Sequence, residues 1–132
     1  MTVVDSSGIV DFLLGGGAAR HVELLLEQEG ELAAPDLLVF EVLAVLRRQA
    51  ARDLDDARAA GAVQDLGDLA LALFPSLPLR QRAFALRRNF TIADAIFIAL
   101  AEALGEPFAT KDLPLANEAA KHAGVDIVML TA

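Results

Sequence analysis

Short apolar runs alternate along this chain with longer stretches in which apolar residues recur every three or four positions. The first pattern is typical of buried strands and the second of helices with one buried face. We expect strands at residues 2–4, 31–34, 73–74, 107–110 and 126–130. We expect helices at residues 6–14, 18–29, 36–52, 54–72, 78–88, 91–104 and 112–123. Asp36 is placed to cap the helix that follows it. The alternation predicts an α/β fold whose helices cover a central, mostly parallel sheet.

Length and composition narrow the class of protein. The 132 residues allow one domain, which we place at residues 1–132. Apolar residues make up 55% of the chain and the mean hydropathy is +0.48, so a disordered chain is excluded. Small monomers rarely hide so large an apolar share, and we therefore expect the chain to form an oligomer.

The chain has no segment suited to a membrane. A spanning helix needs about 20 nearly uncharged residues, and the most apolar stretch, residues 32–46, contains Pro35, Asp36 and Glu41. The N-terminus lacks the basic region of a secretory signal. Cysteine is absent, which excludes disulfides, thiolate chemistry and cysteine zinc sites. We expect a cytoplasmic protein, because its composition is compatible with a reducing compartment.

The charged residues are unevenly distributed. The net charge of −8 opposes loose binding to nucleic acid, because phosphate contacts require Lys and Arg. The arginines nevertheless form two groups, Arg47, Arg48 and Arg52, and then Arg80, Arg82, Arg87 and Arg88. The sequence leaves two interpretations of the second group open. Its side chains contact RNA phosphates, or they form a solvated helix face that offsets the acidic residues.

Two acidic residues come directly after predicted strands. Asp5 follows the first strand, and Asp112 lies just beyond Thr110, where the strand at 107–110 ends. In open α/β sheets, ligands bind at the carboxyl ends of the strands. The alternative is structural, because Asp is a good N-cap and a helix begins after each of these residues. Both interpretations stay open for Asp5 and for Asp112.

Two further acidic residues lie within apolar helices. Glu41 is the only charged residue among residues 37–46, and a charged Glu in a dry core costs several kcal/mol unless it is paired or bound to a cation. Its alternative is a narrow polar stripe shared with Arg48. Asp94 lies in the first turn of another apolar helix, where the alternative is a capping box with Thr91.

Together, these four carboxylates indicate a cation site. A parallel sheet can bring two strand ends and two helices to one edge. Two negative charges about 5 Å apart repel each other by roughly 3 kcal/mol at an effective dielectric near 20. Such a cluster holds protons or binds a cation. Oxygen ligands without nearby His or Cys select Mg²⁺, with Mn²⁺ as a possible substitute. Either ion could orient a water and neutralise charge at a phosphodiester.

The segments that carry these acids resemble the PIN-domain pattern, and most closely that of the VapC toxins. They are residues 3–7, 34–48, 89–101 and 108–112. Their order and spacing match over about residues 2 to 130, which is almost the whole chain. The sequence differs from the family pattern at Ala93, because many members have Tyr directly before the acid that corresponds to Asp94. This difference leaves the four acidic residues intact.

The resemblance implies a three-layer α/β/α domain and a Mg²⁺-dependent endoribonuclease that cuts structured RNA such as transfer RNA. It also implies a homodimer that is neutralised by a small VapB-like antitoxin, whose tail blocks the acidic site. Carried over by position, the metal ligands are Asp5, Glu41, Asp94 and Asp112. Ser7 and Thr110 would hold carboxylates or waters in place.

Two other functions compete with this hypothesis. A PIN-like module could bind RNA or protein without cutting, although the presence of all four acids disfavours it. A receiver-like phosphoryl-transfer domain also gathers acids at strand ends around Mg²⁺. Receivers need an acidic pair near the first strand. Here Asp5 is followed by Ser6 and Ser7, so the sequence disfavours a receiver-like domain.

Overall fold

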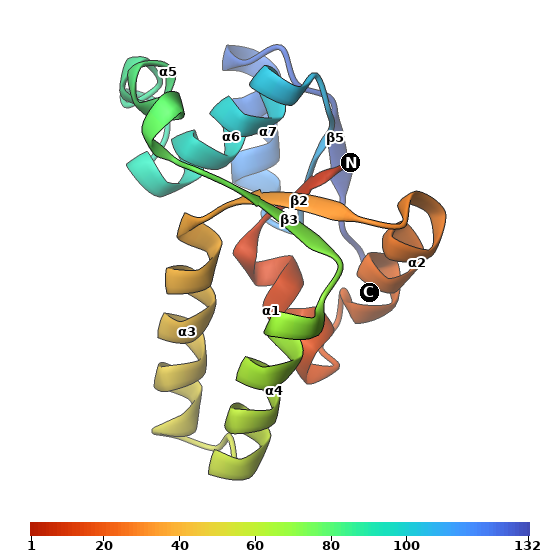
Figure 1. Ribbon diagram of the computed structural model, residues 1–132. Helices are drawn as coiled ribbons and strands as arrows, with labels where there is room; N and C mark the ends of the chain where they lie inside the picture. Colours follow the sequence, from red (N-terminus) through yellow and green to blue (C-terminus); the bar gives the residue numbers. More distant parts are fainter.

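A parallel β-sheet forms the middle layer of the computed structural model, which describes all residues from 1 to 132 (Figure 1). The strands are β1 (Val3–Val4), β2 (Leu32–Pro35), β3 (Leu71–Phe74), β4 (Phe108–Thr110) and β5 (Ile127–Met129). They lie in the order β3-β2-β1-β4-β5, and every neighbouring pair is parallel. The expectation of a mostly parallel sheet is therefore confirmed, and the observed sheet contains no antiparallel strand.

Helices cover both faces of this sheet. They are α1 (Ser6–Leu14), α2 (Ala19–Glu29), α3 (Leu37–Ala50), α4 (Asp56–Asp68), α5 (Arg80–Ala85), α6 (Ile92–Leu104) and α7 (Leu113–His122). Figure 1 shows α1, α3 and α4 on one side of the sheet and α5, α6 and α7 on the other. The helix α1 contacts α2 and α3, whereas α6 contacts β1, β2 and β4 and is covered by α5. The three-layer α/β/α arrangement is confirmed. No helix combines the length and the apolar character that crossing a membrane requires.

Small residues in the central strands let the helices approach the sheet. Val3, Ala33 and Ala109 are fully buried, and so is Ile98 of α6, which packs over these strands. Alanine is a poor strand former by itself, yet β2 confirms the strand expected at residues 31–34. Burial on both faces explains this result, because short side chains fit where helices pack on each side of a strand. The buried side chains form one cluster of 29 residues.

The strand order places a crevice at the end of β1. From β1 the chain passes to β2 and β3, then crosses to β4 on the other side of β1 and ends at β5. Ligands of open α/β sheets bind where the strand order reverses, beyond the carboxyl ends of the strands. Asp5 directly follows β1, and Asp112 lies two residues after β4. The topology therefore brings these two predicted site residues to the same edge.

Two predicted helices differ from the structure. The helix expected at 54–72 is α4, which ends at Asp68 because Leu69 adopts an extended backbone (φ −73°, ψ 137°). Residues 71–74 then pair with β2, so the end of the predicted helix is wrong. The helix expected at 78–88 is divided into a 3₁₀ turn, η1 (Leu77–Leu79), and α5, which stops at Ala85.

Candidate active site

Asp5 is held in a fixed position at the carboxyl end of β1. It is the N-cap of α1, and its Oδ1 accepts hydrogen bonds from the Gly8 N–H (3.0 Å) and the Ser7 hydroxyl (2.7 Å). Its Oδ2 accepts a hydrogen bond from the Thr110 hydroxyl. Only 8% of the residue is exposed. Asp5 is therefore a helix cap, and the same bonds fix its carboxylate at the sheet edge with lone pairs left for a further ligand.

Thr110 connects the ends of β1 and β4. It is fully buried, and its hydroxyl donates to Asp5 and accepts the Asp112 N–H at 3.1 Å. Asp112 caps α7, because its Oδ1 accepts the Leu115 N–H at 3.1 Å. One hydroxyl group thus fixes the relative positions of two acidic residues. Ser7 and Thr110 both contact Asp5 directly, which is the arrangement expected of residues that orient a metal ligand.

Asp94 and Asp112 line a common pocket of about 240 Å³. Asp94 lies in the first turn of α6, where its N–H donates to the hydroxyl of the N-cap Thr91 at 3.2 Å. Burial raises the pKa of Asp94, and the negative charges of Asp112 and Asp5 raise it further, while a hydrogen bond with the Thr91 hydroxyl opposes this shift. The charges of three predicted site residues therefore act on one another at this edge.

Glu41 reaches the same group of charges from α3. Burial raises the pKa of Glu41, and the negative charges of Asp94 and Asp5 raise it further. A hydrogen bond with the Ser6 hydroxyl lowers it. Sequence reasoning did not identify Ser6 as a site residue. Its position next to Asp5 was the only local signal, and its partner lies far along the chain on another helix.

The four predicted carboxylates form one electrostatic cluster, which we call the acidic site (Asp5, Glu41, Asp94 and Asp112). All the atoms of this site that could coordinate a metal are carboxylate oxygens, which Mg²⁺ and Mn²⁺ prefer as ligands. The chemistry of the acidic site therefore fits such an ion. No three His, Cys, Asp or Glu side chains stand in an arrangement ready to hold a metal. In Asp5 and Asp112, protein N–H and hydroxyl groups occupy some of the lone pairs. Coordination would therefore require side chains of the acidic site to rotate toward a common point.

Comparison with known proteins identifies the fold family. The PIN domain family matches residues 2–120. The chain belongs to this family. It is 33% identical to Ribonuclease VapC12 of Mycobacterium tuberculosis over 129 residues, which covers 97% of this chain and 99% of that protein. It is 39% identical to Ribonuclease VapC1 of the same organism over 116 residues, 86% of this chain and 87% of that protein. The family predicted from the four acidic segments is confirmed.

Solved structures agree with the assignment to the PIN fold. The crystal structure of PAE2754 from Pyrobaculum aerophilum superimposes with a TM-score of 0.70 and 24% identity, over 95% of this chain and 87% of that one. A toxin–antitoxin complex from Klebsiella pneumoniae gives a TM-score of 0.66 and 19% identity, over 98% of this chain and 97% of the matched chain. At these identities the likeness supports the α/β/α fold of this PIN domain.

The arginines considered as RNA contacts have different surroundings in this PIN domain. Arg82 donates from Nε and Nη2 to the two carboxylate oxygens of Glu102, at 2.8 and 2.9 Å. The Arg87 guanidinium lies 4.4 Å from the centre of the Phe84 ring. Arg80 and Arg88 are exposed. Arg82 would have to break a bidentate ion pair before it could contact phosphate, whereas the other three keep donors free for solvent or a ligand.

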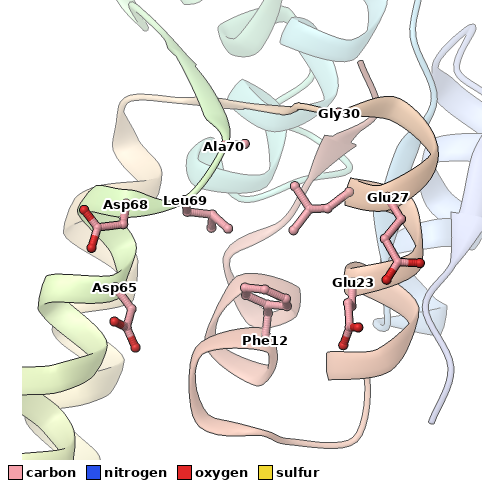
Figure 2. A pocket seen from close by; sticks show the side chains of 9 residues that line it. Phe12, Glu23, Glu27, Gly30, Asp65, Asp68, Leu69 and Ala70 are labelled. Carbon is pink, nitrogen blue, oxygen red and sulfur yellow. The ribbon is translucent and has the colours of Figure 1, made fainter.

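A larger pocket lies away from the acidic site, between α1, α2 and α4 (Figure 2). It measures about 490 Å³, and Phe12, Leu26 and Leu69 give it an apolar lining. Four carboxylates also line it, from Glu23, Glu27, Asp65 and Asp68. Arg20 pairs with Glu23 at 2.6 Å and lies 3.8 Å from Glu27, and no hydroxyl group links these carboxylates as Thr110 links Asp5 and Asp112. None of the four predicted nuclease residues lines this pocket.

Proposed function

We propose that this PIN domain is a Mg²⁺-dependent endoribonuclease that acts as the toxin of a toxin–antitoxin pair, with Mn²⁺ as a possible substitute ion. The observation that carries the proposal is the convergence of Asp5, Glu41, Asp94 and Asp112 at the topological reversal of the sheet. Burial raises the pKa of Glu41 and Asp94, the neighbouring negative charges raise it further, and a divalent cation would relieve that repulsion.

The residues of the acidic site have distinct tasks in this proposal. Asp5 and Asp112 supply carboxylates whose positions are fixed by Thr110. Glu41 and Asp94 would supply carboxylates from two helices, in the ionised form that a metal ligand requires. A divalent cation held by these residues would lower the pKa of a water at the site and neutralise charge at the phosphodiester. The pocket beside Asp94 and Asp112 is open to solvent and gives the scissile phosphate access.

The substrate and the protein partner are inferred from the relatives. Proteins that resemble the chain over most of its length are named ribonucleases of the VapC type, and one structure of the same fold is a toxin–antitoxin complex. We infer that the substrate is structured RNA such as transfer RNA and that a VapB-like antitoxin blocks the acidic site. Arg80, Arg87 and Arg88 are the arginines best placed to contact RNA phosphates.

A homodimer is part of the proposal. Leu77, Phe84 and Ile92 are 72%, 59% and 48% exposed, and they surround a groove of about 510 Å³ beside α6. Large apolar side chains gathered in one patch are typical of an interaction surface. This groove shares no lining residue with the pocket beside Asp94 and Asp112, so it is a surface separate from the acidic site.

Incubation of the purified protein with total RNA tests the proposal. We expect cleavage with Mg²⁺, no cleavage with EDTA, and discrete cut positions when the ends are mapped. Asp94→Asn keeps the shape of the side chain and the N–H bond to Thr91 but removes a charge, so we expect cleavage to fall by about 100-fold or more. Equal cleavage by Asp94→Asn and wild type would contradict the metal mechanism. RNA binding without cleavage by the wild type would favour the non-catalytic module instead.

A further inference from the structure

Thr110, the last residue of β4, contacts the N-cap of α1, and the next residue, Lys111, contacts a side chain within that helix. Thr110 donates to Asp5, the residue that begins the helix. Lys111 extends in another direction, and its Nζ lies 2.8 Å from Oδ2 of Asp11. Asp11 follows Asp5 by six positions, which corresponds to about 9 Å along a helix axis. The ammonium group of Lys111 is therefore held well away from the carboxylate that its neighbour Thr110 contacts.

Asp11 is a fixed acceptor, because bonds other than the one to Lys111 hold it. Its side chain is 14% exposed, and its Oδ2 also accepts the Ala18 N–H at 3.0 Å. Its carbonyl oxygen accepts the Gly16 N–H at 2.8 Å. The loop passes so close that a Cβ at Gly16 would lie 2.5 Å from Oδ1 of Asp11. The position of Asp11 is thus set by the glycine loop, whereas the Lys111 side chain is 43% exposed and flexible.

A free Lys111 would be a competitor for the acidic site. Lys111 directly precedes Asp112, and its stem of four methylenes allows the ammonium to turn toward several neighbouring groups. Four carboxylates that repel one another attract any cation within reach. An ammonium drawn into the acidic site would neutralise part of the charge that a divalent ion needs.

We propose that Asp11 is a positioning residue that holds the Lys111 ammonium away from the acidic site and so keeps its carboxylates available to a divalent cation. This inference rests on the proposed function, since it assumes that the acidic site binds such a cation. It assigns to Asp11 a role that does not depend on contact with RNA.

The test compares wild type with Asp11→Asn, Lys111→Met and the double variant. Asp11→Asn keeps an oxygen for the Ala18 N–H while removing the charge, and Lys111→Met keeps the apolar stem while removing the ammonium. Mn²⁺ binding is measured by calorimetry without RNA, and thermal unfolding reports whether each variant is folded. We expect Asp11→Asn to weaken Mn²⁺ binding about tenfold, and Lys111→Met to change it by less than about twofold. The double variant should bind within about twofold of wild type.

The pattern of the four affinities decides between explanations. Loss of binding in both single variants, without recovery in the double variant, would show that the ion pair only braces the turn and would overturn the proposal. Equal and opposite changes in the single variants would show a long-range charge effect and would also overturn it. If Asp11→Asn damages the fold, the double variant carries the same damage. Recovery of Mn²⁺ binding in the double variant would then still support interference by a released Lys111. No recovery in the double variant would contradict the proposal. A wild-type protein that binds no Mn²⁺ refutes the proposed function itself, and the inference with it.

Discussion

Asp5 and Asp112 each cap a helix at the edge of the sheet where a ligand would bind. Both are N-caps that accept a backbone N–H, from Gly8 and from Leu115. Both also lie at the carboxyl ends of adjacent strands, β1 and β4, where the sheet exposes its ligand-binding edge. A cap uses one or two lone pairs of a carboxylate that has about four. The two interpretations left open by the sequence are therefore compatible, and the cap supplies the rigidity that a metal ligand needs.

The raised pKa values of Glu41 and Asp94 predict a pH-dependent stability. A carboxyl group whose pKa is higher in the folded than in the unfolded protein stabilises the fold below its unfolded value, and this contribution is lost as the pH rises through the raised value. The unfolded values are 4.5 for Glu41 and 3.8 for Asp94. In EDTA we therefore expect Asp94→Asn to have a higher Tm than wild type at about pH 7, and the difference to shrink toward about pH 4.

Thermal unfolding followed by circular dichroism across this pH range measures the effect. Added Mg²⁺ should raise the Tm of the wild type at neutral pH more than that of Asp94→Asn, because the ion offsets the repulsion that the substitution removes. A wild-type Tm that exceeds that of the variant at every pH in EDTA would show that ionised Asp94 is not under electrostatic strain.

For individual residues, the sequence identified those with a local signal and missed those whose role depends on partners distant in the chain. Glu41 was recognised because it is a lone charge in an apolar helix. Asp11 carries the same signal, since it lies between Val10 and Phe12 in α1, yet nothing local shows that its partners are Lys111 and the loop after the helix. Hydrogen bonds between residues distant in sequence require the topology before they can be predicted.

At the scale of single elements, long-range pairing decided the cases in which local pattern was ambiguous. The residues after α4 continue its apolar pattern, but Leu71 to Phe74 pair with every residue of β2 and form a strand. Asp36 occupies the predicted N-cap position of α3, although its side chain makes no capping bond and its Oδ1 accepts the Ser76 hydroxyl instead. The sheet competes successfully for residues whose propensity alone favours a helix.

Glycines in α4 give a test of helix stability that is independent of the acidic site. Gly61 lies within the helix, and a Cβ added there meets no atom within 4 Å. Gly61→Ala should therefore raise the free energy of unfolding by about 0.5–1 kcal/mol, through helix propensity and a less flexible unfolded chain. Gly105 is the matched control, because its φ of +64° ends α6 in the left-handed region.

Denaturant unfolding of both alanine variants measures these effects. Gly105→Ala should lower the free energy of unfolding, because an alanine at that backbone conformation costs roughly 1–2 kcal/mol. RNA cleavage by Gly61→Ala should equal that of the wild type. A destabilised Gly61→Ala would show that α4 makes a close contact at this position that the structure lacks.

At the scale of the whole molecule, strand order creates the acidic site. Local pattern indicated which residues are acidic, where strands end and which helices are apolar. It did not indicate that β1 lies between β2 and β4, and this order is what places Asp5, Thr110 and Asp112 together. The resemblance to PIN domains implied that these residues share one site, but it gave no strand order. Order within a parallel sheet depends on how helices cover its two faces, which is a property of the complete chain.

The exposed apolar patch formed by Leu77, Phe84 and Ile92 predicts self-association through this face. A charge placed in the centre of a dimer interface must be desolvated, so Phe84→Glu should shift the protein from dimer to monomer and weaken dimerisation by at least about tenfold. Sedimentation velocity over a range of concentrations measures the change. Val63→Glu is the control, because Val63 is also an exposed apolar residue (46%) but lies on α4. Dissociation by Val63→Glu with an intact Phe84→Glu dimer would place the interface on the α4 side of the sheet and contradict this prediction.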